Sequence, residues 1–164
     1  MLVSLCGLGI VYFLADHALL SGLRTHLEDL ASLTAKQIDA EAHLKITNGS
    51  IELGAALYEE TSLPLLRLRE QVPDIYYAYT LTFKESNPIF VLDSSYYVKN
   101  EGDATETAMP GEVYDDAPEE LISAWENEHP TSSEKPYTDK WGTFLSAYAP
   151  IRDASGKVSG IVGI

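Results

Sequence analysis

Tyrosine, serine and aspartate side chains recur where this sequence alternates polar and apolar residues. Tyr77 and Tyr79 lie two apart in IYYAYTLTF, and Ser146 and Tyr148 lie two apart in FLSAYAPI. Residues two apart on a β-strand point to the same side of a sheet, so each pair presents hydroxyl groups and ring faces together. Apolar walls with a few convergent polar groups are typical of a small-molecule pocket. Core tyrosines whose polar tips reach an edge would give the same pattern.

Further candidates lie where predicted strands end. Asp93 follows the apolar run IFVL beside two serines, where it has the chemistry to bind a cationic or hydroxylated ligand or to cap the turn. Around the turn DKWG, Trp141 is placed to cover a cavity and Asp139 to accept a ligand hydrogen bond, although turn chemistry alone also explains Asp139. The predicted ligand-binding residues are Tyr77, Tyr79, Asp93, Tyr137, Asp139, Trp141, Ser146 and Tyr148.

One pair has a spacing that suits a metal. Asp39 and His43 are four apart on a predicted helix and share a face, which would let them bind a metal or let the carboxylate orient the imidazole. Two ligands fall short of the three or four that zinc needs, so the expected role is a hydrogen-bond pair between helix and sheet, and no cofactor is predicted. G-x-S-x-G, H-E-x-x-H, phosphate-loop and G-x-G-x-x-G motifs are absent from the sequence, so we predict no enzymatic activity.

The charge of the chain restricts its partners. The 164 residues carry a formal net charge of -14, and the pI is near 4.5. Nucleic-acid binding relies on clustered Lys and Arg, so no nucleic-acid partner is expected. The acidic stretch 101–128 contains no Lys or Arg and no EF-hand pattern, which favours a solvated surface over a metal site. A hydrophobic content of 45% suits one folded domain.

The N-terminal part is predicted to be helical in two stretches of different character. Residues 1–15 are apolar and uncharged, with the single cysteine, and are shorter than the roughly 20 residues that cross a bilayer. We interpret them as the outer part of a transmembrane helix, with a buried core helix as the alternative. Residues 16–48 are predicted to continue as one membrane-proximal signalling helix. Its 3-4-3 leucine spacing suits pairing with a second copy or packing on the chain's own sheet, through Leu20, Leu23, Leu27 and Leu30.

Residues 49–164 are expected to form an α+β domain. Periodicity and turn residues predict helices over 57–72 and 116–128, a loop over 94–112, and strands over 75–83, 89–93, 134–137, 143–151 and 157–164. Together these predict a five-stranded antiparallel sheet, with the long helix on one face and the helical and loop insertion on the other. Small residues at Gly160, Gly163, Ala147 and Ala149 would admit the long helix, leaving the opposite face to line a cavity closed by the insertion.

This arrangement resembles the extracytoplasmic PAS-like sensor domains, called Cache or PDC domains, of bacterial membrane receptors. The resemblance rests on AKQIDAEAHLKI, PDIYYAYTL, FVLDSS, GEVYDDAPEEL and, above all, YTDKWGTFLSAYAPIRDASGKVSGIVGI. It implies a periplasmic domain at the inner membrane, a small-molecule ligand, a homodimer formed through the N-terminal helix, and a histidine kinase or diguanylate cyclase as output. In that family the last strand would continue beyond Ile164. The grouped Arg, Trp and Tyr of amino-acid-binding members are not found here, so the resemblance implies no ligand class.

We therefore expect a ligand-sensing domain of a transmembrane receptor, which relays binding through the N-terminal helix to a cytoplasmic output domain. The sequence is also compatible with two other classes of function. One is a dimerising adhesion or scaffold module whose cavity is filled core and which has no small-molecule ligand. The other is a hydrolase or metal-dependent enzyme that uses Asp39 and His43.

Overall fold

The core of the molecule is a five-stranded antiparallel sheet. A computed structural model describes residues 2–48, 54–98, 107–139 and 142–164. The strand order is β2-β1-β7-β6-β3, with β1 Tyr79–Lys84, β2 Asn87–Asp93, β3 Thr131–Ser132, β6 Ala147–Arg152 and β7 Val158–Gly163. A second, two-stranded sheet pairs β4 Tyr137–Asp139 with β5 Gly142–Phe144. The predicted α+β fold with a five-stranded antiparallel sheet is confirmed.

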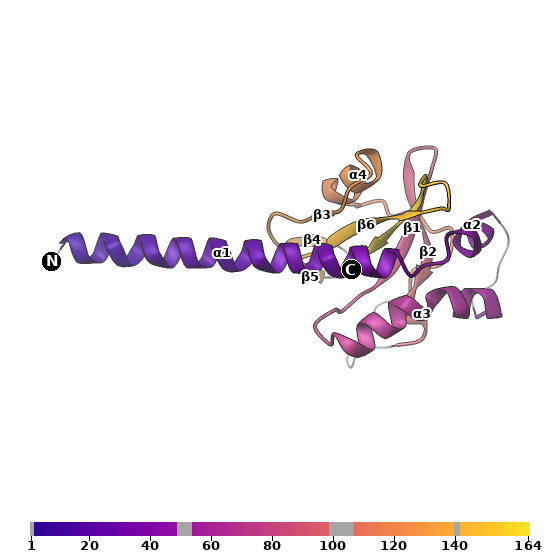
Figure 1. The fold of residues 1–164 in the computed structure, drawn as a ribbon, viewed down its shortest axis with the longest axis horizontal. Helices are drawn as coiled ribbons and strands as arrows, with labels where there is room; N and C mark the ends of the chain where they lie inside the picture. Colours follow the sequence, from indigo (N-terminus) through magenta and orange to yellow (C-terminus); the bar gives the residue numbers. More distant parts are fainter. Residues whose placement is uncertain (1, 49–53, 99–106, 140–141) are drawn as a thin grey trace.

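Helices cover both faces of the sheet (Figure 1). On one face, buried residues of α1 Leu2–Ala35, α2 Ala40–Asn48 and α3 Ala56–Gln71 share a core with Ala147 and Ala149. On the other face, α4 Glu119–Glu126 shares a core with Tyr148. Neighbouring residues of a strand point to opposite faces, so these two cores lie on opposite sides of β6. The predicted placement of the long helix and of the helical insertion is therefore correct.

The helix α1 extends well beyond the domain. Its 34 residues correspond to about 50 Å of helix, and its N-terminal half projects away from the sheet (Figure 1). Its C-terminal half packs on the sheet through buried Leu27, Ala31 and Ala35. In the part of the chain that the structure describes, no helix combines the length and the apolar character of a membrane span.

The prediction of one continuous helix from 16 to 48 is wrong at residues 36–39. The last turn of α1 tightens, with Gln37 N–H donating to the Thr34 carbonyl at 2.9 Å. Asp39 Oδ1 then accepts from the N–H groups of Glu41 and Ala42, at 2.9 and 3.0 Å. An aspartate in this position satisfies the free N–H groups of a helix start, so α2 begins as a new helix without a proline or glycine in the break.

The C-terminal strands also differ from the prediction. The strand expected over 143–151 is split, because β5 pairs with β4 whereas β6 pairs with β3 and β7. Ser146 N–H donates to the Ser133 hydroxyl at 3.0 Å, and Ser133 N–H donates to the Ser146 carbonyl at 2.9 Å. With these two bonds between Ser133 and Ser146, the β3–β6 hydrogen-bond ladder ends at the break between β5 and β6. The strand expected near 134–137 begins later, as β4 at Tyr137, and the fifth strand of the main sheet, β3 Thr131–Ser132, was not predicted.

The glycines of β7 face different neighbours. A Cβ on Gly160 would lie 2.6 Å from His43 Cε1 and 2.8 Å from the Leu81 carbonyl oxygen, so this glycine lets α2 approach the sheet as predicted. A Cβ on Gly163 would instead lie 2.5 Å from the ring of Tyr79. The prediction that Gly163 admits a helix is therefore wrong, because it makes room for a tyrosine ring.

The acidic segment after β2 turns back along that strand. Asp93 caps a short 3-10 helix, η1 Ser94–Tyr96. The described part of the chain resumes at residue 107, and the segment that follows bonds to β2. Phe90 N–H donates to the Glu112 carbonyl at 2.9 Å, and Gly111 N–H donates to the Phe90 carbonyl at 2.8 Å. These bonds cover the edge of β2 and bring Tyr114 beside Phe90.

Candidate functional site

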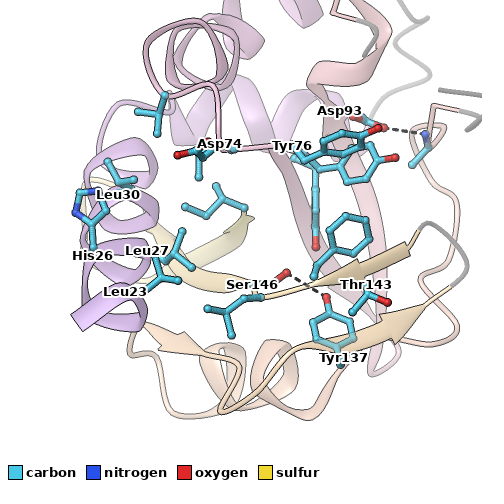
Figure 2. Close-up of a pocket in the computed structure, with 18 of the residues that line it drawn as sticks. Leu23, His26, Leu27, Leu30, Asp74, Tyr76, Asp93, Tyr137, Thr143 and Ser146 are labelled. Carbon is cyan, nitrogen blue, oxygen red and sulfur yellow. Dashed lines mark hydrogen bonds between the residues drawn. The ribbon is translucent and has the colours of Figure 1, made fainter. Parts of the chain in front are cut away.

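A cavity of about 510 Å³ lies at one end of the sheet (Figure 2). This volume is within the roughly 300–1,000 Å³ that is usual for small-molecule pockets. The lining residues come from α1, from the segment before β1 and its first residue, from β2, from the stretch before α4, from the β4–β5 hairpin and the link to β6, and from the residue after β7. They are Leu23, His26, Leu27, Leu30, Val72, Asp74, Ile75, Tyr76, Tyr77, Tyr79, Phe90, Asp93, Ala108, Tyr114, Tyr137, Thr143, Phe144, Leu145, Ser146 and Ile164.

One wall of the cavity is the helix α1. Leu23, His26, Leu27 and Leu30 line it, on the left of Figure 2. Leu27 is buried and Leu30 is packed against the main core. Of the two roles predicted for the leucine stripe, the one observed at these positions is packing on the chain's own domain. The prediction that the insertion closes the cavity is wrong for α4, because none of its residues lines the cavity.

Aromatic rings form much of the remaining wall. Tyr77 lies edge-on to Tyr76 and to Phe144, with ring centroids 4.9 and 5.4 Å apart. Tyr79 contacts Phe90 at a centroid distance of 5.4 Å, and Phe90 contacts Tyr114 at 5.2 Å. Tyr76 and Tyr77 both line the cavity because residues 75–78 precede β1, so strand alternation does not separate them.

Hydroxyl groups form a chain at the lower side of the cavity in Figure 2. Tyr137 donates to Ser146 Oγ at 3.2 Å and lies 2.9 Å from the Tyr148 hydroxyl. Tyr148 is fully buried against the α4 face. Burial first, and the nearby Tyr79 and Tyr137 next, raise the pKa of Tyr148 well above its ordinary value. This hydroxyl therefore stays protonated and holds Tyr137 in place.

Asp93 is a buried carboxylate on the cavity wall. Its Oδ1 accepts from Ser95 N–H at 2.8 Å, and its Oδ2 accepts from Ala108 N–H at 2.9 Å. Burial raises the pKa of Asp93, while these hydrogen bonds and the charge of Arg69 act in the opposite direction. The side chain thus performs the predicted capping role and also reaches the cavity.

The backbone of Asp93 is fixed by Tyr58 of α3. Tyr58 is fully buried, and its hydroxyl accepts from Asp93 N–H at 2.9 Å. Replacing Tyr58 with phenylalanine leaves this N–H unpaired, so we expect the free energy of unfolding to fall by about 1–3 kcal/mol. Urea denaturation measures the change, and Tyr96→Phe, at a ring that is 40% exposed, is the matched control. An equal effect of both variants would contradict this role.

The structure places most predicted site residues at the cavity. Tyr77, Tyr79, Asp93, Tyr137 and Ser146 line it, and Tyr148 lies one hydrogen bond behind Tyr137. The side chain of Asp139 and the whole of Trp141 lie outside the described residues. Whether these residues contact a ligand stays a prediction.

Several lining residues were missed by the sequence analysis. Asp74 follows a proline between the predicted helix 57–72 and the predicted strand 75–83, and Tyr114 lies in an acidic stretch without periodicity. The leucines of α1 had a visible 3-4-3 spacing, but that spacing does not indicate which surface they cover. No sequence signal relates these segments, because the fold alone brings them to one end of the sheet.

Asp39 and His43 do not form a metal pair. The carboxylate of Asp39 caps α2, and His43 Nε2 lies 2.9 Å from the Thr80 hydroxyl in the sheet. The His43 imidazole thus makes the predicted bond between helix and sheet, but its partner is Thr80 and not the Asp39 carboxylate. Among the described residues, no group of three or more His, Cys, Asp and Glu side chains is arranged to hold a metal ion.

Sequence comparisons find no matching family model and no matching curated protein. Structural comparison finds the extracellular domain of the putative histidine kinase mmHK1S-Z2, at TM-score 0.53 and 12% identity, covering 90% of this chain and 54% of that one. Two Campylobacter jejuni Tlp3 chemoreceptor structures, the ligand-binding domain in complex with L-valine and the sensory domain with isoleucine bound, align at TM-score 0.42. Their identities are 13% and 14%, covering 90% of this chain and 61% and 60% of theirs.

The first of these comparisons bears on the fold. This chain spans about half the length of that extracellular domain, and nearly all of this chain is aligned with it. The predicted resemblance to extracytoplasmic PAS-like sensor domains is thereby confirmed as a resemblance of fold. The fold of this chain is similar to that of the extracellular domain of the putative histidine kinase mmHK1S-Z2.

Proposed function

We propose that this chain is the extracytoplasmic ligand-sensing domain of a transmembrane receptor, with a small molecule bound in the cavity at the end of the sheet. The observation that carries the proposal is the composition of the cavity wall. Leucines of α1 and aromatic residues next to β1 and β5 face the same space. One ligand would therefore contact both the long helix and the sheet.

The relay would act through α1. The leucines at the cavity and the projecting N-terminal half belong to one helix, so a shift of the helix at the cavity would move its far end. The energy available is the difference in ligand affinity between the two helix positions, typically about 1–3 kcal/mol of coupling. A cytoplasmic histidine kinase or diguanylate cyclase would receive this displacement.

The membrane anchor and the dimer belong to the same proposal. Residues 1–15 would form the outer part of a transmembrane helix, residues 16–48 the signalling segment, and residues 49–164 the periplasmic sensor domain. Leu14 and Leu19 of α1 are 59% and 74% exposed. Apolar side chains exposed on a projecting helix support pairing of α1 with a second copy.

The same exposed leucines favour a second candidate, a dimerising interaction or scaffold module without a small-molecule ligand. Such a module would use α1 for association, and the cavity would have no occupant. The two functions differ in whether a small molecule stabilises the fold, since a ligand that binds only the native state raises the melting midpoint by mass action.

A thermal melt of the protein against amino acids, amines, organic acids, sugars and metal ions tests the proposal. At a hundredfold excess over Kd, a ligand adds about 2.7 kcal/mol, which corresponds to a midpoint rise of about 5–10 °C. Leu23→Trp, at a cavity residue that is 47% exposed, should abolish the rise. Leu19→Trp, on the same helix outside the cavity, should not. A midpoint that no compound raises would favour the interaction module.

A further inference from the structure

The charges around the cavity are of one sign. Among the lining residues that the structure describes, Asp74 and Asp93 are acidic and none is Lys or Arg. The only other titratable groups there are His26 and the tyrosine hydroxyls. An anionic ligand would meet carboxylates without a fixed positive charge, whereas a cation would be attracted. The net charge of -14 acts in the same direction on an approaching ligand.

Asp93 is the acid that would gain most from a cation. Its side chain is only 7% exposed, and burial raises its pKa because water is withdrawn from the charged form. Arg69 offsets part of this cost, but it donates to Ser94 Oγ and to the Val98 carbonyl and does not line the cavity. The Asp93 oxygens accept from the backbone N–H groups of Ser95 and Ala108, and hydrogen bonding by the Ser95 side chain also favours the charged form. An ionised carboxylate has about four acceptor sites, so it can still accept from a cation.

The rings of the wall supply the second attraction. Tyr76, Tyr77 and Phe144 form one cluster of rings, and Tyr79, Phe90 and Tyr114 form another. The face of an aromatic ring attracts an ammonium group within about 6 Å of its centre, most strongly where water is excluded. The α1 leucines opposite these rings are apolar, so they suit the uncharged part of a ligand.

We propose that the cavity binds a small organic cation, an amine or a quaternary ammonium group carried on an apolar body. Asp93 and the aromatic rings would hold the cationic group, and the leucines of α1 would contact the apolar body. Asp74 lines the cavity and is exposed to solvent, so it would attract the cation as it approaches. This assignment rests on the proposed sensing function of the same cavity.

The test compares ligands with one skeleton and different charge. The protein is melted with phenethylamine, 2-phenylethanol, 3-phenylpropionate and L-phenylalanine, which are respectively a cation, a neutral molecule, an anion and a zwitterion, and with choline as a quaternary cation. We expect phenethylamine or choline to stabilise the protein at concentrations at least about tenfold lower than 3-phenylpropionate or 2-phenylethanol. The zwitterion should lie between the cation and the anion.

Two variants assign the effect to the acids of the cavity. Asp93→Asn is expected to lose affinity for the cation by about tenfold or more, but its carboxylate also accepts two backbone hydrogen bonds, so the variant is less stable. Asp74→Asn keeps the test independent of folding, and should weaken binding of the cation by about threefold without affecting 2-phenylethanol. Asp115→Asn, at an exposed residue outside the cavity, makes the same change of charge and should have no effect.

Each outcome separates the ligand class from the function. Tighter or equal stabilisation by 3-phenylpropionate or 2-phenylethanol, lost in Leu23→Trp, would overturn the cation and leave the sensing function standing. Stabilisation by a cation that persists in Leu23→Trp would place the cation outside the cavity and overturn the assignment. If neither these compounds nor the wider library stabilises the protein, both proposals fail.

Discussion

Replacing Gly160 with alanine is expected to lower the free energy of unfolding by about 2–3 kcal/mol. The added Cβ would lie 2.6 Å from His43 Cε1 and 2.8 Å from the Leu81 carbonyl oxygen. The Leu81 oxygen belongs to the backbone of a central strand, and His43 is fully buried, so neither neighbour can move without disturbing the contact between α2 and the sheet. Urea denaturation of the variant and the parent protein measures the loss.

Gly22→Ala is the matched control for this substitution. Gly22 lies within α1 and is exposed, and a Cβ added there would have no other described atom within 4 Å. Because alanine is favoured over glycine in a helix by up to about 1 kcal/mol, this control should leave the stability unchanged or raise it. If Gly160→Ala is as stable as the parent, α2 does not approach the sheet as closely as described.

Lowering the pH from 6.5 to 4 is expected to cost about 3 kcal/mol of stability through His43 alone. Burial lowers the pKa of His43 from 6.5 to about 4. Its Nε2 contacts Thr80, and its Nδ1 has no hydrogen-bond partner within the described part of the chain. Between pH 6.5 and 4, His43 is therefore protonated in the unfolded chain but stays neutral in the folded chain. Stability is complete above pH 6.5 and falls as the pH approaches 4.

The variant His43→Gln isolates this contribution. Glutamine keeps a polar group near Thr80 and does not titrate, so the difference in unfolding free energy between the two proteins should change by about 3 kcal/mol from pH 7 to pH 4. The other histidines, His17, His26 and His129, are exposed and present in both proteins. Burial raises the pKa of Asp93, so its protonation adds to the stability of the fold as the pH falls. This contribution is the same in both proteins and cancels in the difference between them. A difference that is constant with pH would contradict the buried contact of His43.

The sheet could be predicted because its signals are local. Alternation along TLTF, the turn at Glu85 and Ser86, and the small residues Ala147 and Ala149 each determine a strand, a hairpin or a face within a few residues. The break between α1 and α2 could not be predicted in this way. Residues 36–39 contain no proline or glycine, and only the hydrogen bonds of Asp39 show that capping prevails over helix continuation.

The cavity was predicted in part for a related reason. Tyr77 and Tyr79, close in sequence, were recognised from their spacing, as were Tyr137 and Ser146 from their turn and strand. Asp74, Tyr114 and the α1 leucines join them only through tertiary packing, since they come from segments far apart in the chain. Tyr148 was predicted to line the cavity because it lies two residues after Ser146, but it does not. The break between β5 and β6 separates the two residues, and Tyr148 is buried behind the cavity wall.

A crystal structure of the protein with the compound that stabilises it most is the most direct test of the cavity as a sensory site. We expect the compound between Leu27 of α1 and the rings of Tyr77 and Tyr79, with any cationic group toward Asp93. A compound bound only outside this space, or a cavity filled by its own side chains in the presence of the compound, would contradict it.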